Sequence, residues 1–143
     1  MARIDPLALG RHLAIVWSWR HDFVRDTFFG RLAGEEITVM LGLSIRGKPL
    51  EQCFPPDAVA VVCERYKAAM DGPNFMFGHG KVFARVGLTG YGERIVLPLA
   101  ADGIHADGIL GATVYRLGIT PTARDGVSID HHNEIVSHYP VAG

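Results

Sequence analysis

The alternation of apolar and polar side chains is clearest in residues 91–118, where it predicts two strands joined by a turn. Residues 93–100 place isoleucine and leucine on one side of an extended chain and a set that includes Arg94 on the other. Residues 108–117 are largely apolar on both sides. Because a strand with two apolar faces must be covered on both, we expect residues 108–117 to lie between two layers.

Upstream of this segment, turn residues divide the pattern into short elements. The N-terminal half predicts a helical turn at residues 5–9, a strand at 12–19, a polar reversal at 20–22, a strand at 27–33 and a helix at 35–41. A broken stretch follows, and then the clearest helix of the chain begins at Pro55-Pro56-Asp57 and ends at Asp71-Gly72-Pro73. A strand at 75–86, bulged near 78–80, and a turn at 88–92 complete the pattern.

These elements predict a single α+β domain over residues 1–118. Their order fits a five-stranded antiparallel sheet with the helices packed on one face. After Gly118 the pattern stops, and residues 119–143 are expected to form a C-terminal tail, with its order left open. The tail leaves no room for an output domain, so a signalling role would have to act in trans.

Three stretches resemble a known family: RLAGEEI at 31–37, SIRGKPLEQ at 44–52 and LPLAADGIHADGILGATVY at 97–115. Together with the element order, they resemble a PAS-like family of small bacterial proteins whose biochemical function is largely undefined. The resemblance covers residues 5–117, and its motifs are structural rather than catalytic. It implies a sheet in the order 2-1-5-4-3, with residues 108–117 as the central strand. PAS domains commonly cover the outer sheet face with a flanking helix or a second subunit.

Composition limits the classes of partner. Hydrophobic residues make up 48% and charged residues 20% of the chain, with a formal net charge of −1, so no basic surface for nucleic acid or acidic lipid is expected. No segment resembles a signal peptide or a membrane span. Two cysteines without metal or CxxC spacing favour the reducing cytoplasm.

Buried arginines are the first candidates for ligand binding. Arg31, Arg85 and Arg94 fall in predicted strands, and at least one is expected to point into the domain, where it needs an anion or a carboxylate partner. For Arg31 the favoured partner is Glu35 or Glu36, and ligand binding is the alternative.

Aromatic side chains are the second group of candidates. Four of them could line a pocket between the sheet and the helices, although core packing is the default role: Tyr66, Phe77, Phe83 and Tyr115. His79, between two glycines, either lines a cavity or caps a bulge. The ligand-binding candidates are therefore Arg31, Tyr66, Phe77, His79, Arg85 and Tyr115.

The sequence does not identify a cofactor, and no native metal site is expected. The histidines of the tail, His131, His132 and His138, do not share one face of a regular element. The main helix has no histidine of the kind that haem-binding PAS domains use, and the asparagine-cysteine-arginine motif of flavin photosensors is absent. Cys63 is expected to be a small core residue, and a redox role for Cys53 is disfavoured.

Motifs for phosphate loops, nucleophile elbows and zinc hydrolases are all missing, so we expect no enzyme. An acid or base at Asp102, His105 or Asp107 is the least favoured alternative, because Asp102-Gly103 is more simply a hairpin turn. We expect a sensory or regulatory PAS-like module that binds a small ligand or a signalling protein. The alternative is a structural protein that forms a homodimer through its sheet face and has no functional pocket.

Overall fold

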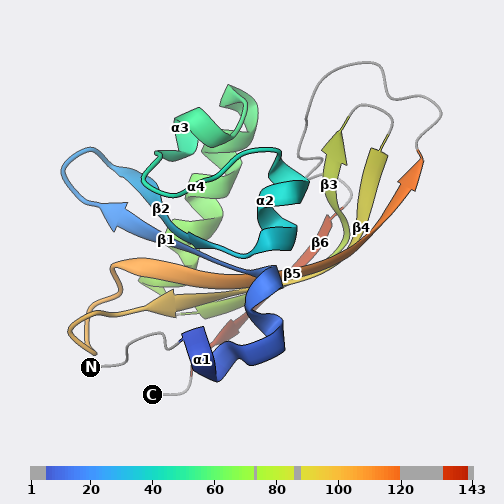
Figure 1. The fold of residues 1–143 in the computed structure, drawn as a ribbon. Coiled ribbons are helices and arrows are strands. Elements are labelled where there is room, and N and C mark those ends of the chain that lie inside the picture. The colour runs from blue at the N-terminus through green and yellow to red at the C-terminus, as the bar shows by residue number, and fades with distance from the viewer. Residues whose placement is uncertain (1–5, 73, 86–87, 120–133, 142–143) are drawn as a thin grey trace.

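The fold is built on one sheet. The computed structural model describes residues 6–72, 74–85, 88–119 and 134–141. Within them, six antiparallel strands follow the order β2-β1-β5-β4-β3-β6 (Figure 1). The strands are β1 (Val16–Asp22), β2 (Thr27–Ala33), β3 (Asn74–Arg85), β4 (Leu88–Leu99), β5 (Gly108–Ile119) and β6 (Glu134–Pro140). The expected α+β class and the order 2-1-5-4-3 are confirmed, and the count of five strands is corrected to six.

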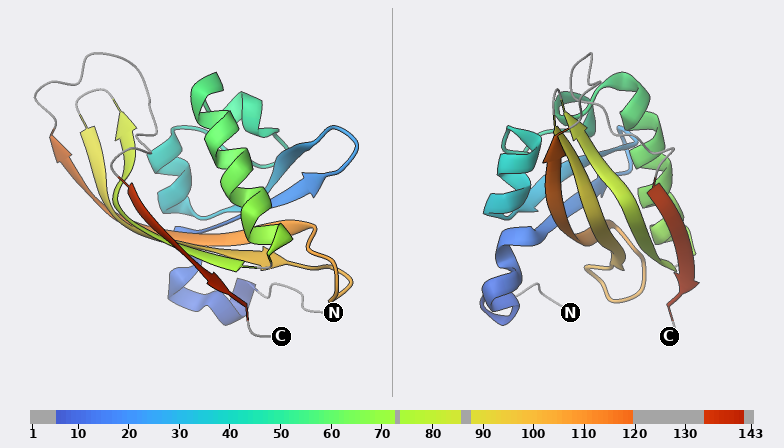
Figure 2. Two further views of the ribbon diagram at one scale, coloured as in Figure 1. Left: turned by 180° about the vertical axis from the view of Figure 1, so that it is seen from behind. Right: turned by 90° about the vertical axis from the view of Figure 1, so that its right-hand side faces the viewer.

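Helices lie on both faces of the sheet. The helices α2 (Glu35–Leu41), α3 (Leu50–Cys53) and α4 (Pro56–Asp71) cover one face, which we call the inner face. The short helix α1 (Pro6–Leu9) and the 3-10 helix η1 (Gly10–Ile15) lie on the opposite, outer face (Figures 1 and 2). The sequence placed the main helices correctly, and the N-terminal segment provides part of the second covering layer.

The helix α4 carries the largest apolar stripe onto the inner face. Proline at its first turn fixes the backbone at the start, as expected from Pro55-Pro56-Asp57. Its buried residues recur at helical spacing: Ala58, Val62, Tyr66, Ala69 and Met70. They pack against Trp17 and Trp19 of β1 in one continuous core. Burying a side chain of this size contributes about 1.5–3 kcal/mol, so this contact stabilises the whole arrangement.

The central strand β5 is covered on its inner face but only in part on its outer face, whereas its sequence predicts cover on both. It pairs with β1 along one edge and with β4 along the other. Ile109 and Thr113 are buried on the inner face. On the outer face Leu110 is half-buried, whereas the Val114 side chain keeps 46% of its surface exposed. The segment η1 covers part of that outer face, and the rest remains open.

A glycine on β5 allows an aromatic ring to lie across the strand. The Trp17 indole passes so close to Gly111 that a β-carbon there would lie 2.2 Å from indole carbon Cζ2. In this position the indole Nε1 donates a hydrogen bond of 2.9 Å to the Thr113 hydroxyl. Since a buried indole N–H needs an acceptor, Gly111 and Thr113 together fix the orientation of Trp17.

The two ends of β1 differ from the sequence prediction. Residues 10–15 form a 3-10 helix rather than the start of a strand, and β1 begins at Val16. The polar residues 20–22 belong to β1, and the turn follows them because the Asp22 carboxylate accepts hydrogen bonds from the amides of Val24 and Arg25. The alternating pattern alone does not separate a strand from a short helix here, because apolar side chains of residues 10–15 can cover the sheet from either element.

The glycine-rich stretch at 88–92 is part of β4, not a turn. Its backbone pairs with β5 as far as Leu88 opposite Ile119. The irregularity in β3 also lies further along the strand than expected, between Lys81 and Phe83 rather than at 78–80. In both places glycine indicated a break, but the long neighbouring strands hold the backbone in the ladder.

The turn between β4 and β5 is held by Asp102. Its carboxylate accepts hydrogen bonds from the His105 ring and from the amides of His105 and Ile104, and these hold the pKa of Asp102 down at about 2. Gly103 follows with a φ of 78°, which completes the predicted turn. The Asp102 side chain is exposed, and the predicted turn role is confirmed.

We expect the Asp102 carboxyl to titrate near pH 2 and to rise toward its ordinary 3.8 in the variant His105→Ala. Because the folded pKa is depressed, the contribution to stability is present above pH 3.8 and is lost as the pH falls toward 2. A carboxyl carbon titration by NMR measures both values. An unchanged Asp102 pKa in His105→Ala would show that the imidazole hydrogen bond does not cause the shift.

Candidate functional site

A small cavity lies between the inner face of the sheet and the helices. The volume open to the centres of water molecules is about 30 Å³. Since one water needs about 10–15 Å³ by this measure, the cavity has room for two waters or a ligand of a few heavy atoms. It is lined by residues from β1, α2, α4, β3, β4, β5 and the loops beside α3: Trp17, Trp19, Ile37, Met40, Leu41, Ile45, Phe54, Tyr66, Val82, Arg94 and Thr113.

Arg94 is the charged group in this mostly apolar lining. It projects from β4 toward the inner face, and its side chain is only 13% exposed. The guanidinium donates one hydrogen bond of 2.6 Å from Nε to Glu134 Oε2 and another of 2.8 Å from Nη2 to the Val82 carbonyl oxygen. The sequence predicted that at least one of three strand arginines would point inward and need an anion or a carboxylate partner, and Arg94 confirms it.

Glu134 at the start of β6 supplies that carboxylate, and its side chain is fully buried. The second oxygen, Oε1, accepts a 2.5 Å hydrogen bond from Arg65 Nη1 of α4. Arg65 is 17% exposed, so the carboxylate joins two largely buried guanidinium groups. The three side chains tie β6, β4 and α4 together beside the cavity, and we call them the Arg65–Glu134–Arg94 cluster.

A glycine on β3 makes room for the buried carboxylate. Gly78 lies opposite Val136 in the β3–β6 ladder. A β-carbon at Gly78 would lie 2.7 Å from Glu134 Oε2. Any side chain at this position would therefore push the carboxylate away from the two arginines.

Tyr66 of α4 adds a second polar group to the cavity. Its ring contacts Trp17, Trp19 and Phe28. Burial raises the pKa of Tyr66 well above its ordinary value, although the positive charges of Arg94 and Arg65 oppose the shift. The phenol therefore stays protonated at physiological pH and can donate a hydrogen bond. No described residue forms a hydrogen bond with this hydroxyl.

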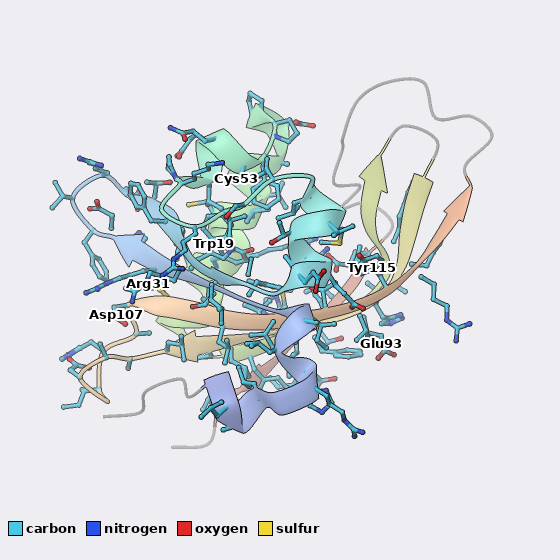
Figure 3. The ribbon with its side chains drawn as sticks, in the orientation of Figure 1. Trp19, Arg31, Cys53, Glu93, Asp107 and Tyr115 are labelled. Atoms are coloured by element: carbon cyan, nitrogen blue, oxygen red, sulfur yellow. The ribbon has the colours of Figure 1, made fainter. Side chains whose placement is uncertain are left out.

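The predicted ligand-binding residues are not brought together. Of those among the six whose side chains the structure describes, only Tyr66 lines the cavity, and Tyr115 donates a hydrogen bond of 3.0 Å to the Glu36 carbonyl oxygen of α2. Arg31 is exposed at the periphery of the sheet and forms no ion pair with Glu35 or Glu36 (Figure 3). A binding role for any of these residues stays a prediction.

The other predicted positions lie on β3. Phe77 and the exposed His79 follow each other on the outer side of the strand, with ring centroids 6.0 Å apart, and neither lines the cavity. The side chains of Arg85 and Phe83 lie outside the described residues. His131 and His132 do as well, while His138 is exposed on β6. Among the described residues, no three potential metal ligands are grouped.

Sequence reasoning missed Glu134 and Arg65. Arg65 stands in the run VCERYKA, where mixed charges suggest a solvated helix face, and Glu134 lies in the predicted tail. The two tryptophans were recognised as one face of a strand but not as cavity walls. The inward arginine in an apolar strand was the one signal that a buried carboxylate had to exist somewhere in the chain.

Both cysteines are free thiols and half-buried. Both cysteines pack against the core. For Cys63 this confirms the expected role of a small core residue. Burial is the main cause that raises the pKa of each thiol, and it outweighs the opposing effect of Lys48 on Cys53 and of Lys67 on Cys63. The reactive thiolate is therefore suppressed at neutral pH.

We expect iodoacetamide to alkylate both cysteines more slowly in the folded protein at pH 7 than in the same protein unfolded in urea. The physical reason is the raised pKa together with limited access to each sulfur. Mass spectrometry of the alkylated peptides separates Cys53 from Cys63. A cysteine that reacted faster in the folded protein than in the unfolded chain would instead have the properties of a redox sensor.

The least favoured catalytic candidates lie away from the cavity. Asp102 and His105 are exposed in the β4–β5 turn, where they bind each other and the turn backbone. Asp107 accepts a hydrogen bond from the Ala101 amide in the same turn. These contacts show that all three side chains stabilise the turn between β4 and β5.

An antiparallel sheet with its main helices on one face and a small cavity between them defines an α+β module suited to sensing or interaction. A model of the PAS domain family matches residues 2–114, and the chain belongs to this family. PAS domains are in general sensory or interaction modules rather than enzymes. The match ends within β5, so β6 and Glu134 lie beyond it.

Neither a search of curated proteins nor a search of solved structures finds a match to the chain. Within the described ranges, no helix is long and apolar enough to cross a membrane.

Proposed function

We propose that this protein is a non-enzymatic PAS module that binds a small ligand in the cavity between sheet and helices and passes the signal to a separate protein. The observation that carries the proposal is the cavity itself. It combines apolar walls with the side chains of two polar residues, Arg94 and Tyr66. An apolar enclosure with a few converging polar groups is typical of a small-molecule site.

The size of the cavity limits the ligand. A volume of about 30 Å³ suits a molecule of few heavy atoms in the arrangement described. The free cysteines support a reducing compartment such as the cytoplasm as the place of action.

Native mass spectrometry of gently purified protein tests this function, because it reports bound small molecules and subunit number together. A second test records NMR spectra with a panel of small neutral, acidic and basic compounds. The expected result is a saturable shift of the Trp17 and Trp19 indole N–H signals. The matched control is Val39→Ala, a change on the exposed side of α2 that should bind as the unmodified protein does. No bound molecule and no indole shift with any compound would contradict the proposal.

The outer sheet face supports a second candidate function, an interaction protein that forms a homodimer. Exposed apolar side chains gather on this face, on β4, β5 and β6: Tyr91, Val114, Ile135 and Tyr139. Tyr139 stacks on Phe75 of β3 with ring centroids 5.0 Å apart, which extends the apolar surface across the strands. Such a surface is a candidate protein interface.

Light scattering at micromolar concentration tests the homodimer. The expected result is twice the mass of one chain, reduced to a single chain by Val114→Glu on the exposed outer face of β5. The control Val39→Glu places the same charge on α2, where the side chain is 64% exposed, and should leave the mass unchanged. A single-chain mass for the unmodified protein would contradict this candidate and leave the cavity proposal intact.

A further inference from the structure

We propose that the two arginines beside the cavity form a binding site for a small carboxylic acid, and that Glu134 fills this site as an internal ligand until a free carboxylate displaces it together with β6. The inference rests on the proposed small-molecule function and specifies the chemical class of its ligand. It also names the segment whose position the ligand changes.

The geometry of the Arg65–Glu134–Arg94 cluster is that of a carboxylate site. Each oxygen of the Glu134 carboxylate accepts a hydrogen bond from a different guanidinium, at 2.5 Å from Arg65 and 2.6 Å from Arg94. Charge-assisted pairs of this kind bind planar anions with high directionality. Once Glu134 has left, the same donors are available to the carboxylate of a free acid.

The charges of the cluster favour an anion. Among the ion pairs of the described residues, Glu134 is the only carboxylate joined to either arginine. Two guanidinium groups facing one carboxylate leave one net positive charge. Without Glu134, both positive charges would lie in a largely buried site without a carboxylate to neutralise them, so the site would favour an anion from solution.

The segment that carries Glu134 is suited to leave. β6 is an edge strand that pairs on one side only, with β3. Figure 2 shows it at the border of the sheet, beside α4. Most of its side chains are exposed, and Val136 is the residue that packs against the core. Edge strands with so few buried contacts open at lower free energy than central ones.

The position of Arg94 indicates what chemical group the ligand carries next to its carboxylate. Arg94 lines the cavity, and the neighbouring walls include Ile37, Met40 and Trp19. A carboxylate bound at Arg94 could therefore place a short apolar group in the cavity. The ligand class that fits both parts is a monocarboxylic acid with a small hydrocarbon chain.

The first experiment is chemical rescue in the variant Glu134→Ala. The removed atoms correspond to acetate, so sodium acetate should raise the Tm of this variant in a saturable way, while sodium chloride at equal ionic strength should not. Glu93→Ala removes an exposed carboxylate from the outer face and is the matched control, with no rescue expected (Figure 3). Equal effects of acetate and chloride on Glu134→Ala would overturn the proposal.

If Glu134→Ala does not fold, Glu134→Gln serves in its place, because glutamine keeps the shape of the side chain while removing its charge. Its amide can still accept a hydrogen bond from one arginine. The apparent affinity for butyrate should then be about ten-fold or more tighter in Glu134→Gln than in the unmodified protein, since the internal competitor is weakened. Equal affinities in both proteins would overturn the competition between Glu134 and the ligand.

The second experiment follows β6 in the unmodified protein by hydrogen exchange and mass spectrometry. Butyrate should accelerate exchange in residues 134–140 and in the β3 amides that face them, and should leave β1 unchanged. Butylamine has a similar shape and the opposite charge, so it should have no effect. Binding of neutral compounds in the cavity with no response to butyrate would overturn this inference while leaving the proposed function standing.

Discussion

Replacing Glu134 with glutamine should lower the free energy of unfolding by about 3 kcal/mol. Removing one partner of a buried ion pair costs about 3–5 kcal/mol, because the remaining charge stays in a poorly solvated site. Here Arg65 and Arg94 keep 17% and 13% of their side-chain surface exposed, and glutamine retains one acceptor, so the lower end applies. Urea denaturation followed by tryptophan fluorescence measures the change.

The control for this prediction is Glu93→Gln, which makes the same chemical change on an exposed side chain of β4. Surface substitutions of this type usually change stability by less than about 0.5 kcal/mol. The slope of the unfolding free energy against urea should stay the same in both variants. A loss below about 1 kcal/mol for Glu134→Gln would mean that solvent reaches the cluster and that its charges contribute little.

The second large effect is expected for Trp19→Ala, at about 3–5 kcal/mol of lost stability. The Trp19 side chain is 2% exposed and contacts both Phe54 and Tyr66. Its removal deletes a large apolar surface and enlarges the existing cavity, which the surrounding strands cannot fully close. Thermal and urea unfolding measure the loss, with Val39→Ala on the exposed side of α2 as the control.

Added indole should partly restore the stability of Trp19→Ala, because an apolar cavity of matching shape binds the missing ring. The same concentration of indole should change the unmodified protein little, since Trp19 occupies the space. If Trp19→Ala unfolded with nearly normal stability, the packing of α4 on β1 would not be the main support of the inner layer.

The sequence predicted an element correctly where residues at its own ends mark where it begins and ends. The strand Thr27–Ala33 and the helix Glu35–Leu41 agree with the predicted ranges residue for residue. The helix ends where predicted because Gly42 takes a φ of 74°, a conformation that favours glycine. The element order then restricted the topology, and five strands fell into the predicted order.

The sequence did not predict contacts between residues that lie far apart along the chain. The bond between Arg94 and Glu134 joins residues 40 positions apart, and the bond between Arg65 and Glu134 spans 69. Sequence periodicity identifies an inward arginine but contains no information about which distant carboxylate meets it. The strand β6 was missed for the same reason, because this short segment forms a strand only beside β3.

The aromatic candidates show a related limit. Tyr66, Phe77 and Tyr115 were grouped by residue type, yet Phe77 lies on the outer side of β3 while Tyr66 faces the cavity. A single shift in strand alternation moves a side chain from one face of the sheet to the other. The sequence therefore predicted that a pocket lies between the sheet and the helices, but not which residues line it.

The pairing of β6 with β3 also bears on aggregation. Without β6, β3 would present an unpaired backbone edge together with Phe75, Met76 and Phe77, a stretch that other chains could extend by strand addition. Instead, the edge of the sheet is the short strand β6. It has exposed polar residues such as His138 and ends in Pro140, which cannot donate a further ladder hydrogen bond. The buried Glu134 carboxylate thus helps to keep the protein dispersed as well as folded.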